Sequence, residues 1–452
     1  MTRPVMASRP VLGPPEPYTF PAVRRSSVGA GDVIAVDLPG QAFASVRLVH
    51  PAGAFTESED QYGVAMLTGD ALEDGQEGNG SLAPALERHG AEWESWVGWD
   101  SFVTGVDVPV NRIVDATRLL ADALRSPAFR SDDIVRRRDQ IREAFVLECS
   151  VPSSLAARAV GSQLFAGRYA VPANGGPKRL DAVDPEMVVD FHRRQLANVA
   201  GTLIVVGDLG KVDVEGLARS VFGDTVRAQP PSPAPVRGAE GAQPRIVVLD
   251  RPGSVQSALV LAHRAPSRAE ADLPAAYGVG DVIGGMFGSR LNLLLREEKG
   301  YTYGAGARFD LRRNGGQFTA SCQVETRHTA DAVASSVAEI VRLREGGVTD
   351  DELATVRESR TVGLPVNYSK VWSVANVLID IEVQGLPDDH IDRLRAGFDA
   401  LTAEKMLDGA REYLRPDELV AVVVGDAEQV AGPLAEIGLG PVSQVDPDAL
   451  WS

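Results

Sequence analysis

The stretch GGMFGSRLNLLLREEKGYTYGAGARF, residues 284–309, combines a helix end, a tight turn and the start of a strand in one segment. Its apolar run, which carries Asn292 and Arg296, predicts a helix, and Gly300 is the natural place for that helix to stop. The TYGAGARF that follows alternates as a strand entering a sheet does. Helix, turn and strand together would aim Arg296 and Tyr303 at one spot.

Arg296 and Tyr303 would be a pair of electrophilic groups without a nucleophile. An arginine offers a permanently charged fork to a carboxylate or an oxyanion, and a tyrosine hydroxyl can donate to a carbonyl oxygen on which negative charge develops. A purely structural interpretation is also open, with Arg296 beside a helix C-terminus and Tyr303 as a half-buried strand aromatic. The rest of the chain has to decide between the two.

The composition indicates a multidomain protein with an acidic surface. Its 452 residues exceed one ordinary hydrophobic core, and a hydrophobic content of 44% is enough to fill several. With 62 acidic and 45 basic residues the net charge is -17, which disfavours nucleic acid or an anionic membrane as partner. Two cysteines, a proline-broken N-terminus and the lack of an apolar run of about 18 residues lead us to expect a cytoplasmic protein.

The two halves of the chain repeat each other around the Pro-rich segment 227–244. Each half contains an apolar strand, 43–50 or 256–263, then a Gly-rich helical stretch, then a charged helix, 132–148 or 350–362. Each also contains a strand that stops at VVGD, with Asp208 matching Asp426. A duplicated α+β unit explains this pattern, and we expect an extension (1–20), a first domain (21–226), a linker (227–244) and a second domain (245–452).

On these features the chain resembles the M16, or pitrilysin-like, metallopeptidases of the two-domain, processing-peptidase-like type. The resemblance covers almost the whole chain and rests on the duplication, the linker, the VVGD strand ends and, above all, residues 284–309. It implies two homologous α/β-sandwich domains in a clam-shell arrangement. It also implies that Arg296 and Tyr303 reach a zinc site and bind the substrate backbone or the oxyanion there.

The zinc motif of that family has lost its chemistry in this sequence. The resemblance places an inverted HxxEH motif within GVAMLTGDALEDG, residues 63–75, where two imidazoles would bind zinc and a glutamate would act as the base. Met66 and Asp70 occupy the histidine positions, and Gly69 occupies the base position. A neutral thioether suits Zn²⁺ poorly and glycine cannot take a proton. We therefore expect this chain to bind no metal.

The third zinc ligand of the family would lie on the helix 132–148, where Glu143 is the nearest candidate and Glu148 the next. Asp70 with Glu143 could hold Mg²⁺ or Ca²⁺, although solvated helix charges explain both residues more simply. The six histidines do not have the spacing of helical metal ligands, and we expect them at the surface or at strand edges.

Together these features predict a non-catalytic subunit of a heterodimeric M16 peptidase. The partner would be a homologous subunit that carries HxxEH and the zinc, and Arg296 and Tyr303 would act in trans on a peptide substrate. An edge strand at 315–326 could take up that peptide. The alternative is a pseudopeptidase that serves as a scaffold or peptide-binding protein with no role in proteolysis.

Overall fold

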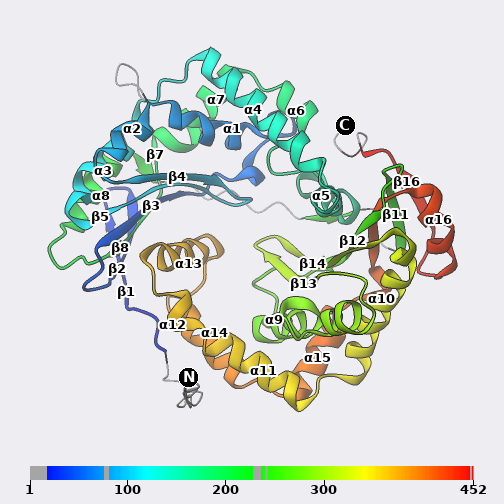
Figure 1. Ribbon diagram of the computed structural model, residues 1–452. Helices are drawn as coiled ribbons and strands as arrows, with labels where there is room; N and C mark the ends of the chain where they lie inside the picture. Colours follow the sequence, from blue (N-terminus) through cyan, green and yellow to red (C-terminus); the bar gives the residue numbers. More distant parts are fainter. Residues whose placement is uncertain (1–17, 76–80, 228–235, 240–242, 448–449, 451–452) are drawn as a thin grey trace, which may run out of the picture.

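The computed structural model describes residues 18–75, 81–227, 236–239, 243–447 and 450. The chain forms two α+β halves, each built on a six-stranded sheet (Figure 1). The first sheet has the order β1-β2-β8-β3-β5-β4. Its strands are β1 (Val23–Val28), β2 (Gly31–Asp37), β3 (Phe43–His50), β4 (Glu92–Val97), β5 (Phe102–Pro109) and β8 (Thr202–Gly207).

The second sheet has the order β13-β14-β12-β15-β11-β16. Its strands are β11 (Arg245–Asp250), β12 (Gln256–Ala265), β13 (Ala305–Arg312), β14 (Gly315–Glu325), β15 (Val420–Gly425) and β16 (Val442–Val445). In both sheets one central strand, β3 or β12, is antiparallel to both neighbours, and the VVGD strand, β8 or β15, runs parallel to β2 or β11. The predicted fold of two homologous α+β units is therefore confirmed.

The aspartates of the two VVGD strands have the same structural role. The Asp208 carboxylate accepts a hydrogen bond from the Gly40 backbone at 2.9 Å, and the Asp426 carboxylate accepts one from the Gly253 backbone at 3.1 Å. Each aspartate thus accepts a hydrogen bond from a backbone amide of an exposed turn beside its strand and helps to fix the conformation of that turn.

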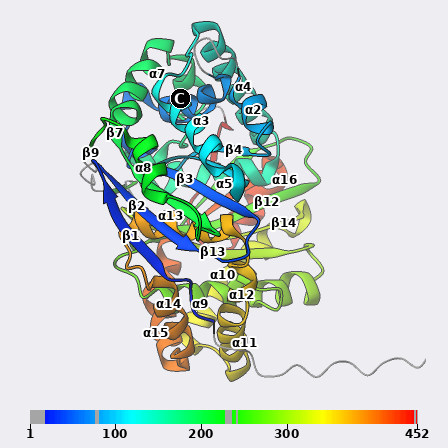
Figure 2. The same ribbon diagram turned by 90° about the vertical axis from the view of Figure 1, so that its left-hand side faces the viewer.

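Each sheet has one face covered by helices of its own half. In the first half these include α1 (Val64–Ala71), α3 (Ile113–Arg125), α4 (Ser131–Cys149), α7 (Pro185–His192) and α8 (Val214–Phe222). In the second half they include α9 (Leu273–Gly280), α10 (Thr329–Gly346), α11 (Asp350–Thr361), α14 (His390–Asp399), α15 (Ala403–Tyr413) and α16 (Ala427–Glu436). Figure 2 shows α3, α4 and α7 of the first half in the upper part of the molecule and α9, α11, α14 and α15 of the second half in the lower part.

The other face of each sheet is covered by a helix from the opposite half. Helix α5 (Pro152–Leu164) packs on β12 and β15, and α13 (Val371–Gln384) packs on β3 and β8 (Figure 1). Leu378 of α13, for example, is fully buried in the cluster that contains Ile204 of β8. Each such buried apolar side chain contributes about 1.5–3 kcal/mol. Neither half therefore has a complete core without the other.

The predicted extension (1–20) and linker (227–244) lie largely outside the described residues, which leave out 1–17, 228–235 and 240–242. The described part of the linker includes a short strand, β10 (Arg237–Gly238), that pairs with β6 (Phe165–Ala166). Among the described helices, none is long and apolar enough to cross a bilayer.

Candidate functional site

Residues 284–309 form a helix, a turn and a strand, but the strand begins later than its pattern predicts. The helical segment η8 (Asn292–Glu298) ends before Gly300, whose φ of +67° is a left-handed conformation that glycine adopts without strain. Because β13 starts at Ala305, Tyr303 lies in the connecting loop. Its side chain is 97% exposed, so the interpretation as a half-buried strand aromatic was wrong.

Asn292 joins the two ends of this helix-turn-strand unit. Its side-chain amide donates to the Met286 carbonyl at 3.2 Å and to Ser289 Oγ at 3.1 Å, and its Oδ1 accepts from the Ala305 backbone at 2.9 Å. A buried amide with these donors and its acceptor satisfied is held in one orientation. The start of β13 is thereby fixed relative to η8.

Arg296 projects from η8 and is partly exposed. Its guanidinium lies 4.7 Å from the centre of the Phe287 ring and pairs with Glu297 at 3.3 Å. Neither contact involves Tyr303. The convergence of Arg296 and Tyr303 on one spot stays a prediction.

Tyr303 lies at the wall of a cavity of about 750 Å³. The loop 300–304 forms one wall, β12 and β14 contribute the sheet side, and Ser153 and Ala157 of α5 approach from the first half. Among the residues that line it, only Glu325 is charged; most of the others offer hydroxyl, amide or backbone groups. Such a lining can bind an extended backbone without strong selection for charge.

The expectation of a free edge strand at 315–326 was wrong for most of that segment. Strand β14 lies between β13 and β12, because the sheet continues one strand further, to β13. The pairing of β13 with β14 begins at Ala305, opposite Cys322. Only residues 323–325 of β14 extend beyond it.

The altered zinc motif lies on α1, which packs against β4. Met66 and Asp70 are partly buried and Gly69 is buried. A Cβ at Gly69 would come within 3.1 Å of Ser95 Oγ and 3.5 Å of the Phe102 ring. A residue larger than glycine at this position would therefore require the Ser95 side chain to move by a few tenths of an ångström.

The chemistry around Asp70 does not fit Zn²⁺. Burial raises the pKa of Asp70 to about 6, Arg137 counteracts this rise, and Glu73 and Asp74 add to it. Zinc sites in proteins are built from imidazole, thiolate and carboxylate ligands. A thioether at Met66 and one carboxylate beside an arginine do not make such a set.

The third-ligand candidates on α4 are exposed. Glu148 forms an ion pair with Arg158, and Glu143 faces solvent. Across the described ranges of the chain, no three His, Cys, Asp or Glu side chains are grouped so that they could hold a metal ion. The alternative site of Asp70 with Glu143 thus has no third protein ligand among those residues.

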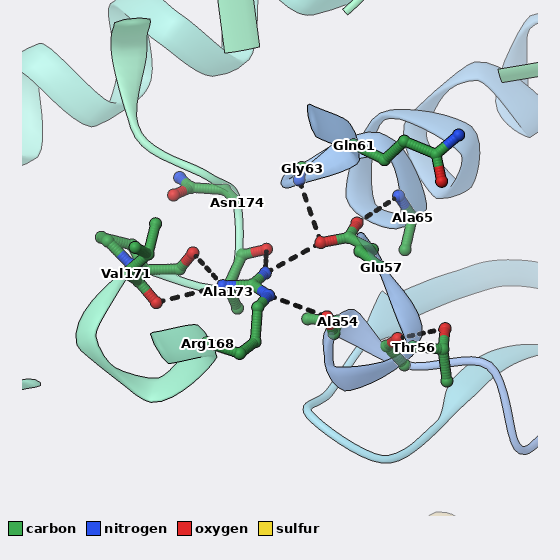
Figure 3. A network of polar contacts seen from close by, with 12 residues as sticks. Ala54, Thr56, Glu57, Gln61, Gly63, Ala65, Arg168, Val171, Ala173 and Asn174 are labelled. Carbon is green, nitrogen blue, oxygen red and sulfur yellow. Dashed lines mark hydrogen bonds and ion pairs between the residues drawn. The ribbon is translucent and has the colours of Figure 1, made fainter. Parts of the chain in front are cut away.

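The sequence interpretation missed a buried ion pair beside α1, between Glu57 and Arg168 (Figure 3). The two side chains are 0% and 6% exposed and meet at 2.9 Å. The Glu57 carboxylate also accepts hydrogen bonds from the Gly63 and Ala65 backbones, at 3.1 and 2.7 Å. An acidic side chain at a helix N-terminus satisfies otherwise unpaired amides and interacts favourably with the helix dipole.

The Arg168 guanidinium completes this network with backbone carbonyls. It donates to Ala54 at 2.8 Å, to Val171 and Pro172 at 3.1 and 3.0 Å, and to Ala173 at 2.8 Å. Burial raises the pKa of the Glu57 carboxyl, and Arg168 and the two amides oppose that rise. A glutamate six residues before Gly63, the N-cap of α1, was the available signal, but nothing local connects it to Arg168.

The expectation that the histidines lie at the surface or at strand edges was wrong for four of them. His50, His192, His263 and His390 are buried. The rings of the first three each have a nitrogen within hydrogen-bonding distance of a backbone carbonyl, at 3.1, 2.7 and 2.9 Å. Hydrogen bonds of this kind let an imidazole be buried.

Comparisons with known proteins agree with this architecture. Residues 32–165 match the family description Insulinase (Peptidase family M16), and residues 182–360 match Peptidase M16 inactive domain. An "Uncharacterized zinc protease" of Mycobacterium tuberculosis is 25% identical over 405 residues, which are 82% of this chain and 90% of that relative.

Two solved structures share the fold. The peptidase M16 inactive domain from Pseudomonas fluorescens has a TM-score of 0.82 and 23% identity, over 89% of this chain and 98% of that one. A protease from Helicobacter pylori has a TM-score of 0.80 and 16% identity, over 90% and 99% of the two chains. With both halves matched by family descriptions and the duplicated fold shared, this chain belongs to the M16 peptidase family.

Proposed function

We propose that this protein is a non-catalytic subunit of a two-chain M16 peptidase that degrades or processes peptides. The partner would be a homologous subunit that carries HxxEH and supplies the metal chemistry. The observation that carries the proposal is a contrast within one chain. The zinc-motif positions on α1 hold Met66 and Asp70 in place of the histidine ligands and Gly69 in place of the base, whereas Tyr303 is almost fully exposed beside the large cavity.

In the complex, Tyr303 would act on the substrate carbonyl. Its hydroxyl would donate a hydrogen bond to the carbonyl oxygen as negative charge develops there, and the loss of one such donor typically lowers kcat about 10² to 10³-fold. An exposed side chain on a short loop can reach a site on a second chain. This exposure supports a role in trans.

Arg296 would bind the peptide backbone or stabilise the same oxyanion. Its guanidinium is held by an aromatic ring and a neighbouring carboxylate, Phe287 and Glu297, both at the surface. Exposed contacts of this kind are worth about 1 kcal/mol or less, so a substrate carboxylate or oxyanion can replace them.

The cavity beside Tyr303 supports an extended peptide of mixed sequence as the substrate class. Glu325 is the one charged residue among those that line it, and Gln256 and Gln323 offer amides. The end of β14 at 323–325 pairs with β12 but is not covered by β13, so on that side it offers backbone groups to which a strand can add.

The decisive experiment mixes this protein with an HxxEH-bearing homologue from the same cell and measures cleavage of an internally quenched fluorescent peptide. We expect no cleavage and no stoichiometric zinc in the protein alone, and cleavage in the mixture. Arg296→Ala and Tyr303→Phe should lower kcat of the mixture while subunit association is unchanged. Arg393→Ala, an exposed arginine on α14 whose ion-pair partner Asp389 is also exposed, is the matched control.

Zinc-dependent hydrolysis by the purified chain alone would refute this proposal. Full turnover in both the Arg296→Ala and Tyr303→Phe mixtures would instead favour the alternative, a pseudopeptidase scaffold or peptide-binding protein in which both residues are idle.

A further inference from the structure

The loop that carries Tyr303 has little to hold it in place by itself. It contains Gly300 and Gly304 and continues into Gly306, and glycine leaves a backbone more conformational freedom than any other residue. Within the loop, Thr302 Oγ1 contacts the Gly304 backbone at 2.9 and 3.2 Å. Tyr303, at 97% exposure, gains almost no packing of its own.

Two side chains near the start of α10 hold this loop from outside. Lys299 Nζ pairs with Asp331 Oδ2 at 2.8 Å, and Tyr301 hydrogen-bonds the same carboxylate. The Tyr301 ring also stacks on His328, with centroids 4.0 Å apart and planes inclined by 13°. The contacts of Lys299 and Tyr301 with α10 thus hold the chain just before Tyr303. Asn292 holds it just after, at the start of β13.

These contacts suit positioning better than global stability. The Lys299–Asp331 pair is largely at the surface, where an ion pair contributes about 0–1 kcal/mol, too little to decide whether the chain folds. A small displacement of a group that acts on a transition state can nevertheless lower a rate by about 10²-fold. Losing the contacts should therefore affect catalysis more than folding.

We propose that Asp331 and His328 are positioning residues that hold Tyr303 in the orientation it needs to act on a substrate bound at the partner subunit. This inference rests on the proposed function, because it assumes that the Tyr303 hydroxyl contributes to the rate. The contribution of the Tyr303 hydroxyl to the rate then depends on two residues that touch neither the substrate nor Tyr303 itself.

The test is a double-mutant cycle in the mixed complex, read with the same fluorescent peptide. Asp331→Asn and His328→Ala should each lower kcat on the order of 10-fold, with KM and subunit association unchanged. In a Tyr303→Phe background neither should lower kcat further. His328→Phe, which keeps the stacked ring, should restore the rate. Asp350→Asn, in the first turn of α11, is the matched control and should have no effect.

A second readout reports on the loop directly. Hydrogen exchange of the backbone amides in 299–306 should become faster in Asp331→Asn and His328→Ala, and should stay unchanged in Asp350→Asn and in Tyr303→Phe. Protection that is the same in all variants would show that the two residues do not hold the loop.

The outcomes separate the two proposals. If Tyr303→Phe lowers kcat but Asp331→Asn and His328→Ala do not, or do so equally in both backgrounds, the positioning inference is overturned and the proposed function stands. If Tyr303→Phe leaves kcat unchanged, the role of Tyr303 in trans fails and the positioning inference fails with it.

Discussion

Replacing Arg168 by methionine should open the N-terminus of α1. The substitution keeps an unbranched apolar side chain in the site but removes the guanidinium. It leaves the Glu57 carboxylate buried at 0% exposure with only two amide donors, from Gly63 and Ala65. Breaking a buried ion pair by removing one partner costs about 3–5 kcal/mol.

The contacts predict how much stability the loss of Arg168 and the loss of Glu57 would each cost. Arg168 also serves four backbone carbonyls, so its loss should cost more than that of Glu57. Glu57→Gln keeps an acceptor and removes the charge, for about 1–3 kcal/mol. In the double variant the buried charge is gone, and the two costs should fall short of additivity by about 0.5–3 kcal/mol.

Hydrogen exchange on peptides from residues 57–71 measures this opening locally, which is preferable because a chain of two interlocked halves need not unfold in two states. Arg179→Met is the matched control. Both guanidiniums lie over the Tyr62 ring, Arg168 at 4.3 Å and Arg179 at 5.1 Å from its centre. The ion pair of Arg179 is with Glu59, which is exposed, and at 3.5 Å it is long. If Arg168→Met speeds exchange no more than Arg179→Met, the account of the network as the anchor of α1 is wrong.

Three further predictions concern the altered zinc motif, the packing of α13 on the sheet of the other half, and the helix-turn-strand unit of residues 284–309. Burial raises the pKa of Asp70 to about 6, so the contribution of this carboxyl to stability is lost as the pH rises from about 4 through 6. In urea denaturation, Asp70→Asn should therefore be more stable than the wild type by roughly 1–2 kcal/mol at about pH 8 and equal to it below about pH 4. Leu378→Ala, at 0% exposure on α13, should lower thermal stability by about 2–5 kcal/mol, whereas Val366→Ala, at 76% exposure, should change it by less than about 0.5 kcal/mol. Equal effects would contradict the packing of α13 on the sheet of the first half. Asn292→Ala leaves the Ala305 amide without its acceptor and should cost about 1–3 kcal/mol, with faster exchange at the start of β13.

Local patterns in the sequence predicted much of the secondary structure. The apolar run at 43–50 is strand β3, and the charged stretch at 132–148 is α4 with one more residue at each end. The stretch at 350–362 is α11, which begins with a capping box between Thr349 and Glu352. These elements are set by near neighbours, which is why periodicity and capping residues were enough.

Local patterns failed where long-range packing decides. The run TYGAGARF alternates from its first residue, yet the chain enters the sheet only at Ala305, where β14 offers Cys322 as a partner. Strand β14 continues to Glu325, but residues 302–304 do not pair with it. The chain before them is tied to the start of α10 through Lys299 and Tyr301, so Tyr303 is left in solvent. The same limit applies to 315–326, whose position inside the sheet depends on β13.

The sequence by itself determined that the chain is a duplicated α+β protein of the M16 family and that Met66, Gly69 and Asp70 replace the two histidines and the glutamate of the zinc motif. Both follow from residue identity and spacing, which need no coordinates. Only the tertiary structure decided that α5 and α13 exchange sheets, that Arg168 neutralises Glu57 across 111 positions of chain, and that Asp331 and His328 contact the loop of Tyr303. Those contacts join residues that are distant in sequence. An apolar face or a charge is compatible with many partners, so its residue type alone does not specify which distant residue it contacts.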